Sequence, residues 1–316
     1  MKPYVSVLIP AYNEEINIGK CIESIQSQTY PRDRFEVIVM DNGSVDDTRN
    51  IVKNVGVRVV NADGLLIGGV RNAGVDASIG DYLAFIDADC VANTDWLESG
   101  VGLLTASEEV GAVGGQCSVP KNATWVQRAW GFKKNDLGIR RVNILSTGSF
   151  FIERSMFFRV GGFNEQILAG EDTEISRKII ESGKKLLLSS AVGVMHLGYP
   201  SSIKEFLKRQ IWQSSDYLKS TKSKNDPIFL IVHLYLLLIV LSSVALVFDW
   251  PKKMALLLFI GSVLLALLLT IYRHVKYKRG VNVLLFSQYT ILNFLYLLAR
   301  SFGLLRSYLR LMIQKR

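Results

Sequence analysis

Two aspartates separated by a single residue carry the clearest chemical signal in this sequence of 316 residues. Asp87 and Asp89 stand at the end of the apolar run 81–87, which predicts a strand whose two carboxylates point to the same side. Paired hard oxygen ligands suit Mg²⁺ or Mn²⁺, with phosphate oxygens completing the coordination shell. Such a metal would offset the charge of a diphosphate and stabilise it as a leaving group. The alternative is a pair of solvated aspartates that cap the next turn.

Strands and helices alternate in the segment that leads to these aspartates. Short apolar runs predict strands at 4–9, 35–40, 57–60 and 81–87. Apolar residues at helical spacing predict helices at 14–28, 47–54 and 68–79 between them. This alternation is typical of an α/β fold with a parallel sheet wound in the Rossmann manner, and ligands of such sheets bind at the carboxyl ends of the strands. Further strands are predicted at 110–119, 142–153 and 185–190, and further helices at 95–107 and 172–182.

Three more motifs surround the aspartate pair. They read VSVLIPAYNEE at 5–15, DNGSVDDT at 41–48 and RNAG at 71–74. With these motifs in this order, the chain resembles the family-2 glycosyltransferases over about residues 4–215. The resemblance implies an inverting enzyme with the A-type nucleotide-sugar fold, here a Rossmann-like nucleotide-diphospho-sugar transferase domain in residues 1–225.

The resemblance also implies which residues hold the nucleotide. These are Pro10, Ala11, Tyr12, Glu14, Asp41, Arg71 and Asp87. The ring of Tyr12 would stack on the base, and Asp41 would accept hydrogen bonds from the base or ribose. Arg71 would approach the diphosphate, where a planar cation is useful. The alternatives are a half-buried loop aromatic for Tyr12 and a surface helix charge for Arg71.

A second acidic cluster, Glu171-Asp172, follows the segment GGFNE at 161–165. The same family has a G-G-F…E-D segment whose aspartate is the general base. The resemblance therefore implies that Asp172 takes a proton from the acceptor hydroxyl as it attacks the sugar, and that Glu171 contacts the acceptor. Alternatively, both acids stabilise the N-terminus of a helix electrostatically, and the two roles can hold together.

One histidine and an arginine–tryptophan pair complete the candidate residues. Some relatives place a metal-ligating histidine after the E-D helix, which makes His196 a candidate ligand beside Asp89 and Asp87; a packed or hydrogen-bonded imidazole is the alternative. Arg209 and Trp212 resemble the R-W signature with which processive relatives contact diphosphate and acceptor. The fuller Q-x-x-R-W pattern is absent, which argues against processive polymerisation.

The C-terminal part, 226–316, is far more apolar than the rest of the chain. Helices predicted at 228–248 and 254–272 are long enough to cross a bilayer. Basic residues precede the first span and follow the second, so the positive-inside rule places both ends in the cytoplasm and the turn between them outside. The same placement favours a membrane surface over nucleic acid as the reason for the net charge of +9.

Two further helices are expected at the membrane. Residues 203–219 form an amphipathic helix that lies on the membrane surface or packs on its own domain. Residues 281–310 form an interfacial helix or a third membrane helix; a span would leave basic residues outside, against the positive-inside rule. The three cysteines lack C-x-x-C spacing and the N-terminal apolar stretch is too short for a signal peptide. We therefore expect the globular part in a reducing cytoplasm.

These features predict a multi-pass membrane enzyme that is metal-dependent, with Mg²⁺ or Mn²⁺. It would move a sugar from a nucleotide-sugar donor, UDP-linked by resemblance, to a hydroxyl of a lipid-linked glycan at the cytoplasmic face. The product would serve the synthesis of cell-surface polysaccharide or glycoconjugate. A polyprenyl-phosphate sugar synthase is the alternative, although its ionised phosphate acceptor needs no base. A metal-dependent nucleotidyltransferase should carry a glycine-rich phosphate loop, which residues 10–20 lack, and intact acidic clusters argue against an inactive membrane scaffold.

Overall fold

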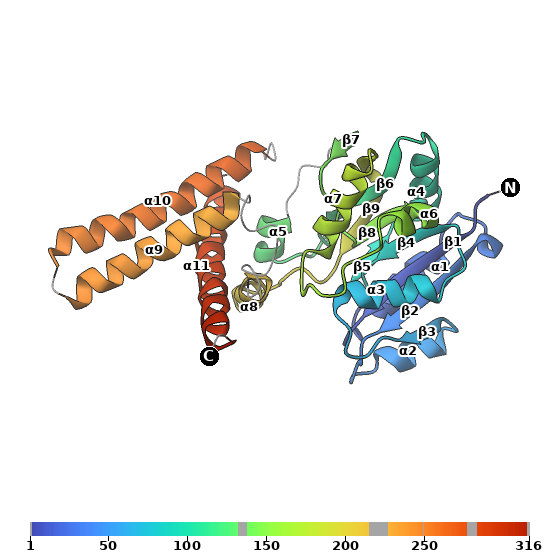
Figure 1. The fold of residues 1–316 in the computed structure, drawn as a ribbon, viewed down its shortest axis with the longest axis horizontal. Helices are drawn as coiled ribbons and strands as arrows, with labels where there is room; N and C mark the ends of the chain where they lie inside the picture. Colours follow the sequence, from blue (N-terminus) through green and yellow to red (C-terminus); the bar gives the residue numbers. More distant parts are fainter. Residues whose placement is uncertain (1, 132–137, 215–226, 249, 277–282, 315–316) are drawn as a thin grey trace. The chain divides into compact units, whose positions relative to one another are not determined.

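The computed structural model describes residues 2–131, 138–214, 227–248, 250–276 and 283–314. They belong to two compact units, and the elements of both are labelled in Figure 1. The first unit comprises Met1–Pro120 and Asn135–Gly198, and the second comprises Lys121–Lys134 and Tyr199–Arg316. The second unit therefore takes in a middle segment and the helix that follows Gly198, whereas the boundary expected from the sequence lay at residue 225.

Within the described part of the chain, a nine-stranded sheet forms the centre of the first unit. Its strands are β1 (Val5–Ala11), β2 (Phe35–Asp41), β3 (Arg58–Asn61), β4 (Tyr82–Ile86), β5 (Cys90–Ala92), β6 (Val110–Ser118), β7 (Ile139–Val142), β8 (Ser149–Glu153) and β9 (Lys185–His196). They are ordered β3-β2-β1-β4-β8-β6-β9-β5, with β7 also paired to β9. The first four strands are parallel, which confirms the Rossmann-like α/β fold predicted for this part. Beyond β4 the sheet is mixed, because β5, β7 and β8 pair antiparallel with their neighbours.

Helices cover both faces of this sheet. On one face lie α1 (Ile18–Gln26), α2 (Thr48–Asn54) and α4 (Trp96–Thr105), which share one hydrophobic cluster. On the other lie α3 (Ile67–Asp76), α6 (Arg154–Arg159) and α7 (Glu171–Glu181), which share a second cluster. A short 3₁₀ turn, η1 (Arg32–Arg34), leads into β2. In α1 the buried residues Ile18, Cys21, Ile22 and Ile25 follow the spacing of one helix face, as expected for a helix packed on a sheet.

The single strand predicted at 142–153 is wrong. The chain instead forms β7, which ends at Val142 and pairs with β9, and β8, which begins at Ser149 and pairs with β4 and β6. Between them, the side chain of Leu145 is buried and its backbone N–H donates to Ser176 Oγ at 3.1 Å. This detour leaves the sheet and brings Gly148 close to Asp87.

The second unit is helical in its described residues. It contains α5 (Trp125–Gly131), α8 (Ile203–Ser214), α9 (Pro227–Val247), α10 (Lys252–Lys276) and α11 (Val283–Gln314). Length and composition would allow α9, α10 and α11 each to cross a membrane. The predicted spans 228–248 and 254–272 fall in α9 and α10, and Lys252 and Lys253, expected in the turn, begin α10. The predicted helix 203–219 is α8 as far as Ser214; its last part, 215–219, lies outside the described residues.

Helix α11 crosses α9 near the amino-terminal end of α9. Phe294 packs on Tyr235 with ring centroids 5.9 Å apart, and Tyr308 shares a hydrogen bond of 3.0 Å with His233. Fourteen residues separate Phe294 from Tyr308, or about 21 Å of helix, whereas their partners on α9 lie about 3 Å apart along the axis. Two helices that ran side by side would show matched spacings. The crossing is therefore steep, and Figure 1 shows α11 running across the α9–α10 pair.

Candidate active site

Polar residues gather at the carboxyl ends of β2, β1 and β4, at one edge of the parallel sheet. Ala11, the last residue of β1, is in register with Asp41, the last residue of β2. Asp87 follows β4 directly, and a turn closed by a hydrogen bond from Cys90 N–H to Asp87 C=O at 2.9 Å leads into β5. This is the edge at which open α/β sheets bind their ligands, as the sequence predicts.

Arg71 on α3 joins two acidic segments. Its Nη2 donates to Asp87 Oδ1 at 3.0 Å and its Nη1 donates to Glu171 Oε1 at 2.7 Å. Arg71 is only 3% exposed, and its guanidinium carbon lies 5.6 Å from the centroid of the Phe163 ring. Its Nε is buried without a hydrogen-bond partner among the described residues. Arg71 is therefore no surface charge: it fixes Asp87 and Glu171 in one site, and its contact with a diphosphate stays a prediction.

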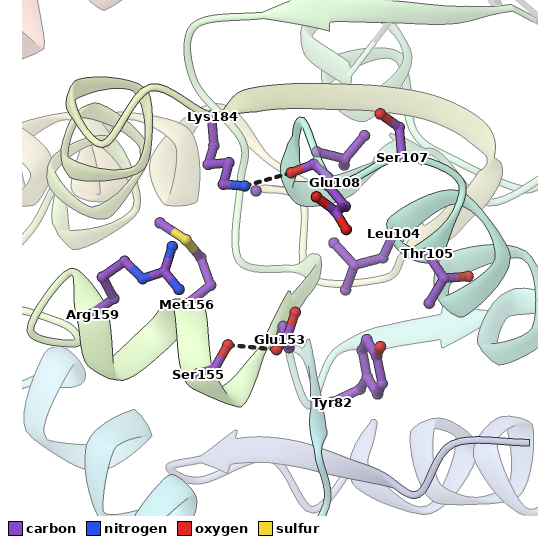
Figure 2. Close-up of a pocket in the computed structure, with 12 residues that line it drawn as sticks. Tyr82, Leu104, Thr105, Ser107, Glu108, Glu153, Ser155, Met156, Arg159 and Lys184 are labelled. Atoms are coloured by element: carbon purple, nitrogen blue, oxygen red, sulfur yellow. Dashed lines mark hydrogen bonds between the residues drawn. The ribbon is translucent and has the colours of Figure 1, made fainter.

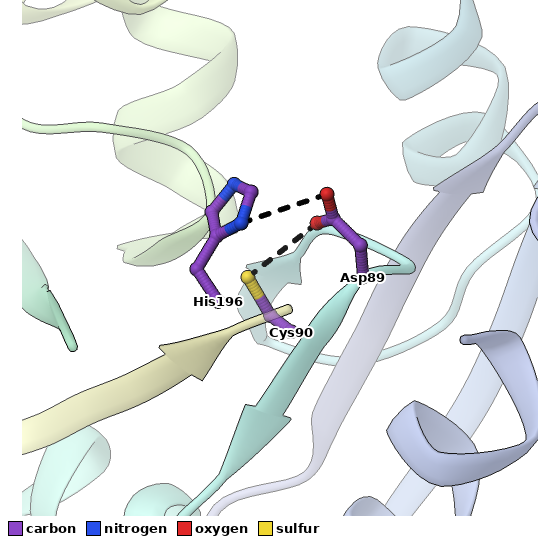
Figure 3. Close-up of side chains that lie close together, drawn as sticks. All are labelled: Asp89, Cys90 and His196. Carbon is purple, nitrogen blue, oxygen red and sulfur yellow. Dashed lines mark hydrogen bonds and ion pairs between the residues drawn. The ribbon is translucent and has the colours of Figure 1, made fainter. Parts of the chain in front are cut away.

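Asp89 and His196 face each other across β5 and β9 (Figure 3). Cys90 is in register with His196, which brings the imidazole Nδ1 to 3.6 Å from Asp89 Oδ2. The thiol of Cys90 lies beside them, with its Sγ 3.7 Å from Asp89 Oδ1. Leu197 N–H donates to the backbone C=O of Asp89 at 2.7 Å, so the chain after β9 is anchored to the aspartate pair.

These side chains fit a divalent cation. The distance of 3.6 Å between His196 Nδ1 and Asp89 Oδ2 suits two ligands of one ion, because metal–ligand bonds are about 2.1 Å long. Burial, together with the carboxylates of Asp87 and Asp89, raises the pKa of Cys90 well above its usual range. A protonated thiol is a poor ligand for a hard cation, which leaves Asp89 and His196 as the fitting pair.

Glu14 adds to the negative charge at the site. Burial, and then the nearby Asp89 and Asp87, raise the pKa of this carboxyl, against an opposing hydrogen bond from Asn17 Nδ2 at 2.9 Å. The negative charges gathered beside Glu14 form a place that a divalent cation would stabilise.

Asp41 is fully buried and is held by one of its two oxygens. Oδ2 accepts hydrogen bonds from Arg49 Nε and from Ser44 N–H, the latter at 3.2 Å. Oδ1 is buried without a partner among the described residues, so it can accept a hydrogen bond from a ligand N–H or O–H. Arg49 also donates to Asp63 Oδ1 at 2.9 Å, which fixes its guanidinium against Asp41.

The loop after β1 is bonded to the loop after β2. Asn13 takes a left-handed conformation, with φ of 54°, and its Oδ1 accepts a hydrogen bond from Val45 N–H at 2.9 Å. Glu14 N–H donates to Thr48 Oγ1 at 2.8 Å. Tyr12 is left 59% exposed, as a stacking ring must be, whereas Pro10 and Ala11 are buried in β1 and present little side chain to a ligand.

Helix α7 begins at the E-D pair. Gly170, with φ of 95°, precedes it, and the first turn holds Glu171, Asp172 and Glu174, which favours the helix N-terminus electrostatically. Asp172 Oδ1 accepts hydrogen bonds from Thr173 N–H at 2.6 Å and from Thr173 Oγ1 at 3.2 Å. Because Glu171 is tied to Asp87 through Arg71, the E-D pair and the aspartate pair belong to one site.

Arg209 and Trp212 lie on α8, in the second unit. Trp212 is 59% exposed. Their assignment to the diphosphate or acceptor stays a prediction.

Sequence reasoning missed two residues that shape the site. A Cβ on Gly198 would overlap Asp89 Oδ2, so only glycine leaves room for this carboxylate. Arg49, which orients Asp41, gave no signal beyond following the DNGSVDDT motif directly. For Gly198, the hint that the sequence offered is its position two residues after His196.

A hollow of about 340 Å³ lies elsewhere in the first unit (Figure 2). It is lined by Tyr82, which begins β4, and by Glu153, its partner in β8, together with Arg159 and Lys184. This is the opposite end of β4 from Asp87, so the hollow is not part of the site described above.

Comparison with known proteins was made by family, sequence and structure. The family model for glycosyl transferase family 2 matches residues 6–166. Glycosyltransferase AglE of Haloferax volcanii is 33% identical over 218 residues, which cover 66% of this chain and 71% of that protein. Validoxylamine A glucosyltransferase of Streptomyces hygroscopicus subsp. limoneus is 26% identical over 226 residues, which cover 59% of this chain and 50% of that protein.

Among solved structures, the mannosyltransferase PcManGT from Pyrobaculum calidifontis, in complex with GDP-Man and Mn²⁺, is similar to this chain. The TM-score is 0.61 at 20% identity, and the match covers 96% of this chain and 88% of that one. Identity at this level shows a shared fold, here a mixed α/β sheet with a Rossmann-like half.

Proposed function

Since this chain belongs to glycosyltransferase family 2, whose members act on nucleotide sugars, we propose that it transfers a sugar, with inversion, to a hydroxyl of a lipid-linked glycan at the cytoplasmic membrane face. The observation that carries the proposal is the Arg71 bridge. It joins the carboxylates suited to a donor diphosphate with the E-D pair suited to an acceptor. Both halves of a transfer reaction thus share one site.

On the donor side, Asp89 and His196 would hold the divalent ion, which would offset the charge of the departing diphosphate. The Mn²⁺ bound with GDP-Man in PcManGT supports a metal of this class. Because Mg²⁺ prefers oxygen ligands, the imidazole of His196 favours Mn²⁺. Asp41 Oδ1 would accept a hydrogen bond from the base or ribose, and Tyr12 would stack on the base.

On the acceptor side, Asp172 would act as the general base. It would take the proton of the acceptor hydroxyl as that oxygen attacks the anomeric carbon and the bond to the diphosphate breaks on the opposite face. Thr173 donates two hydrogen bonds to Asp172 Oδ1, which orient the carboxylate. The products are an inverted glycoside, a nucleoside diphosphate and a proton held by Asp172.

The apolar helices support placement at a membrane. We propose that α9 and α10 span it and that α11, which crosses their end steeply, lies in the cytoplasmic interface. The basic residues before α9 and after α10 then face the cytoplasm, in agreement with the positive-inside rule.

The proposal is tested with full-length protein in lipid nanodiscs, a panel of nucleotide sugars and an extracted lipid-linked glycan. Wild type should release nucleoside diphosphate and form a glycosylated lipid only with Mn²⁺ or Mg²⁺. Asp172→Asn should lower transfer at least a hundredfold while donor affinity stays within about threefold. Full transfer by this variant would overturn the base assignment, and transfer to a bare polyprenyl phosphate would favour the synthase alternative.

A further inference from the structure

Asn72, which follows Arg71 on α3, holds both backbone groups of Phe163. Its Nδ2 donates to Phe163 C=O at 3.0 Å, and its Oδ1 accepts a hydrogen bond from Phe163 N–H at 3.1 Å. The same Nδ2 also donates to Glu165 Oε1 at 2.8 Å. A side-chain amide has two N–H donors and one carbonyl oxygen, so both donors and the acceptor of this side chain serve one segment, 161–165.

Two glycines let this segment approach α3 closely. Gly162 has a left-handed backbone, with φ of 62°, and a Cβ on it would come within 3.2 Å of Asn72 Oδ1. A Cβ on Gly68, in the first turn of α3, would overlap the backbone C=O of Asn164. The segment and the helix therefore meet at backbone distance, where a short side chain that both donates and accepts is needed. Aspartate has the same length as asparagine but no N–H to donate.

The ring of Phe163 supports the guanidinium of Arg71. The ring is buried and packs edge-to-face on Phe85 of β4, with centroids 5.3 Å apart. The guanidinium carbon of Arg71 lies 5.6 Å from the centroid of Phe163, at a distance where a ring attracts a cation. Because Arg71 Nε has no hydrogen-bond partner among the described residues, the guanidinium is held by its two carboxylates and by this ring.

The segment 161–165 also contacts α7, the helix that begins with the E-D pair. Lys178 of α7 donates from Nζ to Gly162 C=O at 3.3 Å and pairs with Glu174 Oε1 at 3.2 Å. One segment thus packs between the helix that carries the arginine and the helix that carries the acidic pair. A shift of this segment would move the ring that supports the arginine and disturb the bridge between the two acidic segments.

We propose that Asn72 is a positioning residue for sugar transfer, because it fixes Phe163 against the Arg71 guanidinium. Through that guanidinium it sets the separation of Asp87 and Glu171. The inference rests on the proposed function, since it takes these two carboxylates to face the donor and the acceptor. The three hydrogen bonds of Asn72 all go to the segment 161–165, so it acts on the reaction through other residues.

The experiment uses full-length protein in lipid nanodiscs with Mn²⁺ and the nucleotide sugar that gives the fastest turnover in the panel. Two rates are measured: transfer to the extracted lipid-linked glycan, and hydrolysis of the nucleotide sugar when the acceptor is withheld. Asn72→Ala should lower both rates about tenfold or more, because small displacements of reacting groups slow transfer strongly. Asn50→Ala is the matched control: this exposed asparagine of α2 donates to Asp47 Oδ1 at 2.8 Å, and its loss should change both rates less than twofold.

Coupling to Arg71 separates positioning from a merely structural role. In the Arg71→Lys background the planar bridge is already lost, so Asn72→Ala should lower the rates less than a further threefold. Independent defects would instead multiply, because their free energies add. A full tenfold loss in both backgrounds would therefore overturn the inference.

A second pair of substitutions decides if Asn72→Ala does not fold, as judged by its Tm. Asn72→Asp keeps the length of the side chain but places a carboxylate opposite Glu165, so both rates should fall about tenfold or more. Glu165→Gln in that background supplies an amide donor to the new carboxylate and should recover the rates at least threefold. A double variant no faster than Asn72→Asp alone would contradict the positioning role.

The two rates keep this inference distinct from the proposed function. Wild type that glycosylates the lipid-linked glycan, with losses that multiply in the double variant, would sink the inference alone. Wild type that hydrolyses the nucleotide sugar with the expected coupling, yet glycosylates no lipid-linked glycan, would sink the proposed acceptor and leave Asn72 its role.

Discussion

Arg71 Nη1 donates a hydrogen bond of 2.7 Å to Glu171 Oε1, across 100 residues of sequence. Both side chains are buried, and the second nitrogen of the same guanidinium holds Asp87. One arginine thus fixes the distance between the segment expected to face the donor and the segment expected to face the acceptor. Reactive groups must be held to within a fraction of an ångström for transfer to be fast, and a buried bidentate bridge achieves this.

Replacement of Arg71 should harm both stability and transfer. Arg71→Gln leaves the buried carboxylate of Glu171 and the half-buried carboxylate of Asp87 poorly compensated, so we expect a loss of about 3–5 kcal/mol in the free energy of unfolding. Arg71→Lys keeps one charge but cannot bridge two carboxylates in a plane, so it should lose less stability while transfer still falls about tenfold or more. Urea unfolding and product formation measure the two effects.

Arg177→Gln is the control for that experiment. Arg177 pairs with Glu181 on the exposed surface of α7, where an ion pair contributes about 0–1 kcal/mol. Equal losses in the Arg71 and Arg177 variants would show that the bridge has no special role.

A second prediction concerns Gly198, whose absent side chain makes room for Asp89. Gly198→Ala places a Cβ on Asp89 Oδ2 and must displace that carboxylate or the chain after β9. We expect the Mn²⁺ concentration for half-maximal transfer to rise about tenfold or more, because the loss of a contact that orients a metal ligand weakens metal binding by about this factor. Titration of activity with Mn²⁺ measures the shift.

Gly102→Ala is the matched substitution in the same unit. Gly102 lies in α4 and a Cβ there meets no atom within 4 Å, so alanine should stabilise the protein by about 0.5–1 kcal/mol and leave the Mn²⁺ requirement unchanged. If Gly198→Ala behaves like Gly102→Ala, the close approach to Asp89 is not important for metal binding.

A third prediction separates recognition of the nucleotide from binding of the metal. Asp41→Asn replaces a charged acceptor by an amide, and we expect nucleoside diphosphate affinity to fall about tenfold, the effect of one charge-assisted hydrogen bond. Calorimetry with nucleoside diphosphate and Mn²⁺ measures it. Asp63→Asn should be nearly neutral, because Asp63 is exposed and reaches Asp41 only through Arg49. A larger loss for Asp63→Asn than for Asp41→Asn would contradict this order.

The first half of the fold could be predicted because its information is local. Alternation of apolar strands with helices of fixed spacing indicates the parallel strands β1 to β4, and strand ends then place Asp41 and Asp87 at one edge. The antiparallel strands β5 and β8 could not be predicted in the same way, because their direction depends on distant partners. Cys90 of β5 pairs with His196 of β9, and Glu153 of β8 pairs with Tyr82 of β4.

The site shows the same division. The spacing of the aspartate pair indicated Asp87 and Asp89, and the family resemblance implied Glu171 and Asp172, but neither indicated how these residues are connected. That Arg71 lies between Asp87 and Glu171 depends on the packing of α3 against the sheet, and that Gly198 faces Asp89 depends on the β5–β9 pairing. Long-range contacts of this kind leave no periodic trace in a sequence.

The last prediction follows from the raised pKa of Glu14. Burial and the neighbouring Asp89 and Asp87 make ionisation of this carboxyl harder in the folded protein than in the unfolded chain. Such a group favours the folded state when it is protonated, and its contribution is lost as pH rises through the folded-state pKa. Ionised Glu14 therefore destabilises the metal-free protein at neutral pH.

Glu14→Gln removes this ionisation and keeps an oxygen that can accept the hydrogen bond from Asn17. We expect its Tm without metal to exceed that of wild type by about 1–3 °C at pH 7.5, and the difference to vanish near pH 4, where the unfolded-state carboxyl is protonated as well. Saturating Mn²⁺ should reduce this difference in Tm at pH 7.5, because a bound cation offsets the charges of the carboxylates at the site. Differential scanning calorimetry over this pH range measures the sign of the Tm difference. Glu23→Gln, on the exposed side of α1, is the control. A variant less stable than wild type at pH 7.5 would show that Glu14 is stabilised as a carboxylate by contacts stronger than the repulsion of Asp87 and Asp89.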